Sequence, residues 1–196
     1  MRNKARYVVV FSALIVSLMN PIFSLAEDAA NSLEKGMKAI EIGTGYGWSI
    51  GNTHDMEAVP LNLRWGCVFS DPMGPSYFRG VWEALWEGNV SYLSNHQEKY
   101  GIGVNFLMRY NLLTKNRFVP FVQGGVGVWY TNWIMDRFPN DFNFGSQAGA
   151  GLQYFWNKRT SILGEYRYQH FSNAGLYSHN KGLNLSNFWI GCAFYY

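Results

Sequence analysis

His170 and Ser172 stand two residues apart in the run EYRYQHFSNAG, where an aromatic segment leads into a turn. On a β-strand, residues with this spacing share a face and lie about 6.6 Å apart along the chain. An imidazole at that distance can reach a serine hydroxyl and act as the base for a nucleophile. Asn184, at the start of the next segment, could orient the ring. A His and a Ser at this spacing are more often polar residues at a membrane interface than catalytic residues. The strands that hold them are therefore needed to tell the two cases apart.

The start of the chain has the pattern of an export signal. A positively charged region precedes an apolar stretch that ends near residue 19, and Ser24-Leu25-Ala26 forms a small-x-small cleavage site. We therefore expect a signal peptide over 1–26, a short periplasmic segment over 27–37 and one domain over 38–196. The basic residues of the signal are Arg2, Lys4 and Arg6.

Composition limits the class of protein. The formal net charge of +3 equals the contribution of the three signal residues, so the remaining chain is balanced and no nucleic-acid partner is implied. Aromatic residues make up 18% of the chain, charged residues only 15%, and there are 21 glycines, which is typical of a β-rich protein. After the signal, no apolar stretch is long enough for a transmembrane helix.

Alternating residues recur along the rest of the chain in segments of about ten, the pattern of a membrane β-barrel. The sequence predicts an all-β fold, an eight-stranded antiparallel transmembrane barrel of the outer-membrane type. The expected strands are approximately 38–50, 59–69, 82–92, 100–110, 118–130, 144–155, 161–170 and 184–196.

The two faces of these strands distinguish a membrane barrel from a soluble one. One face is apolar and aromatic, whereas the other collects four carboxylates and three guanidiniums. A soluble barrel such as a lipocalin would show the reverse arrangement. Eight strands enclose only enough room for side chains, so these charges are expected to pair inside and the aromatic face to meet lipid. The charged set is Glu41, Arg64, Glu83, Glu87, Arg109, Glu165 and Arg167.

Connection lengths orient the barrel. The turns over 113–117 and 156–159 are short, as periplasmic turns are, whereas the stretches 131–143 and 174–184 are longer and are expected outside. The connection over 70–78 is the exception. This orientation places His170 and Ser172 at the outer end of their strand, facing lipid, where polar groups are costly without an interface or a function. Five aromatic residues near outer strand ends are expected to form an interfacial girdle: Tyr92, Tyr100, Trp129, Tyr130 and Trp133.

The run His170-Phe171-Ser172-Asn173-Ala174-Gly175, followed by Asn180, Gly182 and a final strand with an aromatic end, resembles the signature of outer-membrane lipid A 3-O-deacylases. The resemblance covers the barrel in outline, and its specific part is the last 30 or so residues. It implies an esterase that removes the 3-hydroxyacyl chain at position 3 of lipid A in the outer leaflet of a Gram-negative outer membrane, without a cofactor.

The resemblance also implies residue roles. Ser172 would be the nucleophile and His170 the general base that takes its proton and returns it to the departing sugar hydroxyl. Asn173, the backbone amide of Gly175 and Asn180 match positions that help to hold the oxyanion. A lipid-facing site suits a substrate that diffuses within the leaflet.

Asn184 departs from the family pattern, which has a glutamate fourteen residues after the histidine. An amide can hold an imidazole through its carbonyl oxygen, but it cannot offset the imidazolium charge. Three outcomes remain open, namely a working Asn-assisted site, a slow enzyme, and a non-catalytic barrel with a structural or surface-binding role. No other acid is well placed, because Glu165 has the inner parity and no Asp or Glu follows His170.

The cysteines and the remaining histidines have simpler explanations than a functional site. Cys67 and Cys192 would lie about 10 Å apart from strand spacing, too far for a disulfide, so we expect two lipid-facing thiols. His54, His96 and His179 fall in outer loops without the close spacing of a metal site, so none is assigned. The sequence leaves open whether two barrels pair as a homodimer.

Overall fold

The computed structural model describes residues 33–51, 56–93, 99–133, 141–176 and 182–196. In it the chain forms a closed barrel of eight antiparallel strands in sequence order, which confirms the expected fold class. The expected signal peptide lies outside the described residues, as do Asn180, His54, His96 and His179. The strands are β1 (Lys38–Ser49), β2 (Glu57–Val68), β3 (Gly80–Leu93), β4 (Tyr100–Leu112), β5 (Phe118–Thr131), β6 (Phe142–Phe155), β7 (Thr160–Ser172) and β8 (Leu183–Tyr195).

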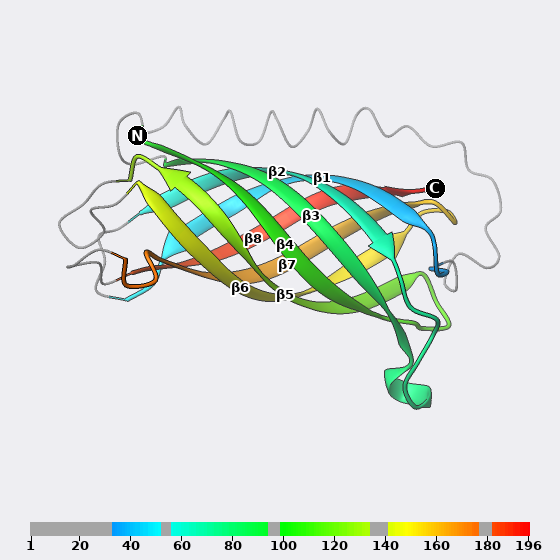
Figure 1. The fold of residues 1–196 in the computed structure, drawn as a ribbon. Coiled ribbons are helices and arrows are strands. Elements are labelled where there is room, and N and C mark those ends of the chain that lie inside the picture. The colour runs from blue at the N-terminus through cyan, green and yellow to red at the C-terminus, as the bar shows by residue number, and fades with distance from the viewer. Residues whose placement is uncertain (1–32, 52–55, 94–98, 134–140, 177–181) are drawn as a thin grey trace, which may run out of the picture.

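The strands wind obliquely around the barrel axis, and β1 pairs with β8 to close the sheet (Figure 1). We call the end where β1 begins and β8 finishes the terminal end, and the opposite end the far end. A short 3₁₀ helix, η1 (Ser76–Phe78), projects from the terminal end between β2 and β3. The other two connections at the terminal end are short, as expected of the periplasmic side of an outer-membrane barrel.

Strand β7 is longer than the sequence predicted. The alternating pattern indicated an end at His170, whereas the strand continues to Ser172 because β6 pairs with it that far, Phe144 opposite Ser172. His170 and Ser172 are therefore both part of the sheet. Their backbone is held by cross-strand hydrogen bonding, which a turn would not provide.

The outer wall of the barrel is apolar and exposed. Large hydrophobic side chains on alternate positions of every strand lie open to the surroundings, among them Ile42, Leu63, Val104, Val126 and Ile190. The intervening positions are buried in the interior and are mostly polar. This inversion of a soluble protein's pattern is the arrangement that lipid requires, and closure leaves no unpaired strand edge in the sheet.

Charged residues fill the middle of the interior and pair with one another, as the sequence predicted. Arg64 binds three carboxylates, through Nε to Glu87 at 2.6 Å, Nη1 to Glu41 at 3.0 Å and Nη2 to Glu165 at 3.1 Å. Arg167 also contacts Glu87 and Glu165, at 2.8 and 2.7 Å. Each of these side chains is almost completely buried. The pairs join β1, β2, β3 and β7 across the interior.

Arg109 extends this network toward the terminal end. Its Nη2 donates to Glu41 at 3.0 Å, and its Nη1 lies 3.4 Å from Glu83. Glu83 also accepts a hydrogen bond from Asn111 Nδ2 at 2.9 Å. The interior therefore holds one more carboxylate than guanidinium, and amide side chains supply the remaining donors.

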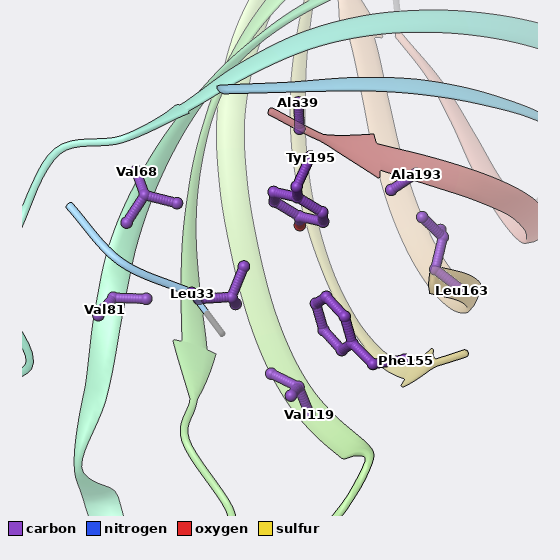
Figure 2. Packing of buried hydrophobic residues seen from close by; sticks show 9 residues of the cluster. All are labelled: Leu33, Ala39, Val68, Val81, Val119, Phe155, Leu163, Ala193 and Tyr195. Carbon is purple, nitrogen blue, oxygen red and sulfur yellow. The ribbon is translucent and has the colours of Figure 1, made fainter. Parts of the chain in front are cut away.

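An apolar cluster closes each end of this polar interior. At the terminal end, Figure 2 shows Leu33 among side chains from several strands, with Phe155 and Tyr195 on one side and Val68 and Val81 on the other. At the far end a second cluster contains Met56, Ala58, Leu93, Trp129, Trp133, Phe171, Leu183 and Leu185.

The far-end cluster corrects the prediction for two girdle residues. Trp129 is only 2% exposed and Trp133 is fully buried, so neither lies at the lipid interface. Trp129 has the inner parity of β5, and it fits because Gly103 on the neighbouring strand has no side chain. A Cβ at Gly103 would fall 2.3 Å from the indole ring. Tyr92, Tyr100 and Tyr130 are exposed, as an aromatic girdle requires.

Two remaining expectations concern thiols and helices. Cys67 and Cys192 are free and half-buried. In the described part of the chain, no helix has the length and apolar character needed to cross a membrane.

Arg64→Met tests how strongly the fold depends on the buried pairs. Removing the guanidinium leaves three buried carboxylates without this partner, and we expect the free energy of unfolding to fall by about 3–5 kcal/mol. The measurement is urea unfolding of the refolded barrel in lipid vesicles. Lys35→Ala is the matched control, because the Lys35–Asp71 pair is exposed and should contribute less than about 1 kcal/mol. Equal losses for the two variants would contradict a structural role for the interior network.

Candidate functional site

His170 and Asn184 face each other across β7 and β8. They are direct cross-strand partners, and His170 Nδ1 lies 2.7 Å from Asn184 Oδ1. An amide oxygen only accepts hydrogen bonds, so Nδ1 carries the proton and donates the hydrogen bond to Asn184 Oδ1. This tautomer leaves Nε2 as the nitrogen with a lone pair, the form in which an imidazole can take a proton.

Ser172 lies on the same outer face as His170 and lines the same open cleft. The cleft has a volume of about 300 Å³ and is formed by β5, β6 and β7, with Val126, Phe144 and Ser146 among its walls. No hydrogen bond joins His170 to Ser172 in the described part of the chain. The cleft therefore presents a serine hydroxyl and an imidazole to a shared space that opens on the lipid-facing wall.

Small side chains continue from the cleft toward the terminal end. On the outward face of β6, Ser146 is followed by Ala148 and Ala150, and all three are exposed. Tyr168 and Tyr166 on β7 lie opposite these alanines in the register. A row of small residues beside bulky tyrosines can accept a hydrocarbon chain lying along the barrel wall.

Phe171 anchors the segment between the two outward side chains. It points inward and meets Trp129 edge-on, with ring centroids 5.1 Å apart and an interplanar angle of 89°. It also meets Trp133 edge-on at 5.7 Å. Trp129 Nε1 donates to Asn105 Oδ1 at 2.9 Å, and Asn105 Nδ2 donates to Glu87. The strand that carries His170 and Ser172 is thus packed onto a cluster tied to the interior charges.

A tight turn follows Ser172. Ala174 and Gly175 both have positive φ, 52° and 78°, and Leu176 N donates to Asn173 O at 3.0 Å, which defines a type I′ turn. The Gly175 amide donates to Asn173 Oδ1 at 3.0 Å. Among the described residues, Ala174 is the one non-glycine with positive φ, and such strain is often found at functional sites.

Gly182 packs against the ring of His170. Its φ of +73° favours glycine, and a Cβ there would fall 2.8 Å from His170 Cε1 and 3.4 Å from Nε2. Any side chain at this position would press on Cε1 of the imidazole, the atom between the two ring nitrogens. Gly182 therefore helps to determine where Nε2 lies.

The structure brings most of the expected site residues together, in the stretch 170–175 and at Asn184. It also shows packing roles for Phe171 and Gly182 that the sequence alone did not indicate. Phe171 has the inner parity, which could have indicated burial beneath the site. Nothing local in the sequence shows that Gly182 approaches the imidazole, because that contact depends on how the connection enters β8.

A carboxylate does not replace Asn184 in the described part of the site. Glu165 lies inside the barrel and binds Arg64 and Arg167, so it cannot reach the outer wall. The described residues also include no cluster of His, Cys, Asp and Glu suited to a metal ion.

A closed antiparallel barrel with an apolar outer wall and a polar interior is the architecture of bacterial outer-membrane proteins. Solved structures agree on this fold. The outer membrane enzyme PagL has 19% sequence identity and a TM-score of 0.59, and the match covers 78% of this chain and 97% of that one. Neisserial surface protein A has 9% identity and a TM-score of 0.61, covering 82% and 99%.

The N-terminal barrel of Pseudomonas aeruginosa OprF is a further match, with 13% identity, a TM-score of 0.50 and coverage of 83% and 100%. A search of curated protein sequences finds no match. The family model described as lipid A 3-O-deacylase (PagL) matches residues 59–193, more than half of the chain.

This chain belongs to the lipid A 3-O-deacylase (PagL) family, which confirms the resemblance drawn from the sequence. It is accordingly a protein of the Gram-negative outer membrane, in a family of hydrolases that act on lipid A.

Gly182→Ala tests whether this glycine positions His170. The added methyl group should displace the imidazole, and a misplacement of about 1 Å can lower a catalytic rate on the order of 10²-fold. The measurement is the rate of lipid A deacylation by the refolded protein. Gly51→Ala is the matched control, since Gly51 also has positive φ, +92°, but a Cβ there would meet no atom within 4 Å. Equal rates for the two variants would show that the contact does not position the ring.

Proposed function

We propose that this protein is an active lipid A 3-O-deacylase that hydrolyses the ester-linked 3-hydroxyacyl chain at position 3, with Ser172 as nucleophile and His170 as general base. The observation that carries the proposal is the 2.7 Å hydrogen bond from His170 Nδ1 to Asn184 Oδ1, beside a cleft shared with Ser172. In serine hydrolases the imidazole is likewise held at Nδ1, which leaves Nε2 to take the proton of the nucleophile.

In the proposed reaction, the Ser172 hydroxyl attacks the ester carbonyl while His170 Nε2 takes its proton. The tetrahedral intermediate then collapses, and His170 returns the proton to the departing sugar hydroxyl. Water hydrolyses the acyl-serine by the same steps. His170 and Ser172 make no hydrogen bond with each other in the described structure. Hydrogen bonds between a nucleophile and its base often tighten only when substrate binds.

The oxyanion would form next to the turn that follows Ser172. Asn173 and the Gly175 amide are adjacent to the nucleophile in sequence, and the turn keeps both at this end of the strand. The Gly175 amide must share or exchange its present acceptor, Asn173 Oδ1, to donate to an oxyanion. Asn180 is the third proposed donor.

The site's location explains how a lipid could reach it. His170 and Ser172 face the wall that meets the bilayer, so a substrate in the outer leaflet can approach laterally without entering the barrel. The row Ser146, Ala148 and Ala150 offers a path for the acyl chain along that wall. We propose that the sugar lies toward the far end and that the chain follows this row.

The presence of Asn184 where the family pattern has a glutamate favours a second candidate function, that of a non-catalytic barrel that has lost the triad acid. The geometry favours the enzyme, because the amide holds the imidazole at the distance a carboxylate would and the serine is retained. The two candidates make opposite predictions for lipid A.

Ser172→Ala separates the two candidates. Cells of a Gram-negative host with a 3-hydroxyacyl ester at position 3 should, on expression of the wild-type protein, lose one hydroxyacyl mass from lipid A, and the variant should abolish that loss. The measurement is mass spectrometry of extracted lipid A, with heat-modifiable gel mobility as the control for folding. A folded wild-type barrel that leaves lipid A unchanged would rule out the enzyme.

Asn184→Glu tests the orienting role. A carboxylate would keep the hydrogen bond to Nδ1 and also stabilise the imidazolium, so kcat should rise. The ceiling is about 10⁴, the factor lost when an amide replaces the triad acid in a serine protease. Asn184→Ala, which removes the acceptor, should lower kcat below that of the wild type. If all three folded proteins deacylate at the same rate, Asn184 does not act on His170.

A further inference from the structure

The connection between β2 and β3 exposes large apolar side chains at the terminal end. Tyr77 is 96% exposed, Phe78 67% and Met73 47%. The other two connections at this end are polar at their centres, Thr114-Lys115-Asn116 and Asn157-Lys158-Arg159. An exposed apolar patch of this kind marks an interaction surface.

This connection has a defined fold, held by backbone hydrogen bonds. Met73 and Gly80 exchange two backbone hydrogen bonds of 2.9 Å, and Phe78 N donates to Pro75 O at 2.8 Å within the 3₁₀ turn. Gly74 has a φ of +93°, and a Cβ there would fall 2.7 Å from Phe78 O. The aromatic residues are therefore presented by a folded hairpin.

Tyr110 attaches this hairpin to the outer wall of the barrel. The Tyr110 hydroxyl lies 2.8 Å from Phe78 O and 3.1 Å from Met73 O, so its single proton is shared between two carbonyl groups of the hairpin. Tyr110 has the outward parity of β4, between the buried Arg109 and Asn111, and its ring packs on Trp82 with centroids 4.9 Å apart. The hairpin, which projects from the terminal end, is thus attached to the surface that faces lipid.

We propose that the segment 71–79 is a phospholipid-binding anchor, with Met73, Tyr77 and Phe78 inserted at the interface of the leaflet on the terminal side and Arg79 beside the phosphates. The patch is continuous with the lipid-facing wall through Tyr110 and Trp82. Tyrosine and phenylalanine beside an exposed arginine match an interface that is apolar on one side and anionic on the other.

The anchor lies far from the candidate site and does not depend on the proposed function. In the closed order of strands, β2 and β3 are on the opposite side of the barrel from β7, and the anchor is at the opposite end. An anchor in one leaflet would fix how deeply β2 and β3 sit in the membrane. The polar turns at the same end would not fix the depth of the strands that they join.

A spin label at Ser76→Cys tests the proposal, because Ser76 is exposed within the hairpin and its substitution keeps both aromatic residues. Cys67→Ala and Cys192→Ala make the label unique. The protein is refolded in phosphatidylethanolamine–phosphatidylglycerol vesicles, and collision rates of the label with oxygen and with a water-soluble nickel chelate are measured. Lys158→Cys on a polar turn and Leu63→Cys on the lipid-facing wall give the aqueous and lipid references.

We expect the oxygen-to-nickel ratio at Ser76→Cys to be several-fold above that at Lys158→Cys and below that at Leu63→Cys. Adding Tyr77→Ser and Phe78→Ser should return the ratio to the aqueous reference, with heat-modifiable mobility showing that the barrel is folded. An aqueous ratio with the native aromatic residues would overturn the proposal, and the hairpin would then face the periplasm as a site for a protein. A ratio unchanged by the two serines would also overturn it, because the aromatic side chains would not be the anchor.

Discussion

The pairing of charges inside the barrel is the constraint on which the rest of the molecule depends. Eight strands leave no room for bulk water, so each guanidinium must pair with carboxylates inside the barrel. Arg64 alone joins three of them, from three different strands. The charges lie on β1, β2, β3, β4 and β7, so this requirement selects which face of those strands points inward, and the opposite face must then be apolar enough for lipid.

The same constraint reaches the candidate site through the far-end cluster. Glu87 accepts from Asn105, Asn105 accepts from Trp129, and Trp129 packs edge-on with Phe171. Phe171 lies between His170 and Ser172 in the chain and points the other way. The outward pair therefore takes its position from inward contacts, and a loop on the lipid-facing wall could not hold two side chains as closely.

Much of this arrangement was predictable, because a two-residue period states which side chains share a face. The period located all eight strands, the interior charges, and the outward direction of His170 and Ser172. It failed where the contact partner is far away in sequence. Aromatic character alone suggests an interfacial place for Trp129 and Trp133, but Trp129 enters the interior because Gly103 leaves space for it. The end of β7 depends on its pairing with β6, and the fold of the segment 71–79 depends on Tyr110.

In the proposed mechanism, Asn184 would supply one of two functions that a triad carboxylate combines. One function is to accept the Nδ1 proton and so fix the tautomer and direction of the ring, and the amide oxygen does this at 2.7 Å. The other is to stabilise the positive charge that the ring acquires during reaction, and a neutral amide lacks the charge for it. Orientation is already present before substrate binds, whereas charge develops only in the transition state. The cost of the substitution should therefore fall on the rate of the chemical step and leave substrate binding intact. A site on a lipid-facing wall has few solvent dipoles to take over that function, so the deficit is greater there than in a water-filled cleft.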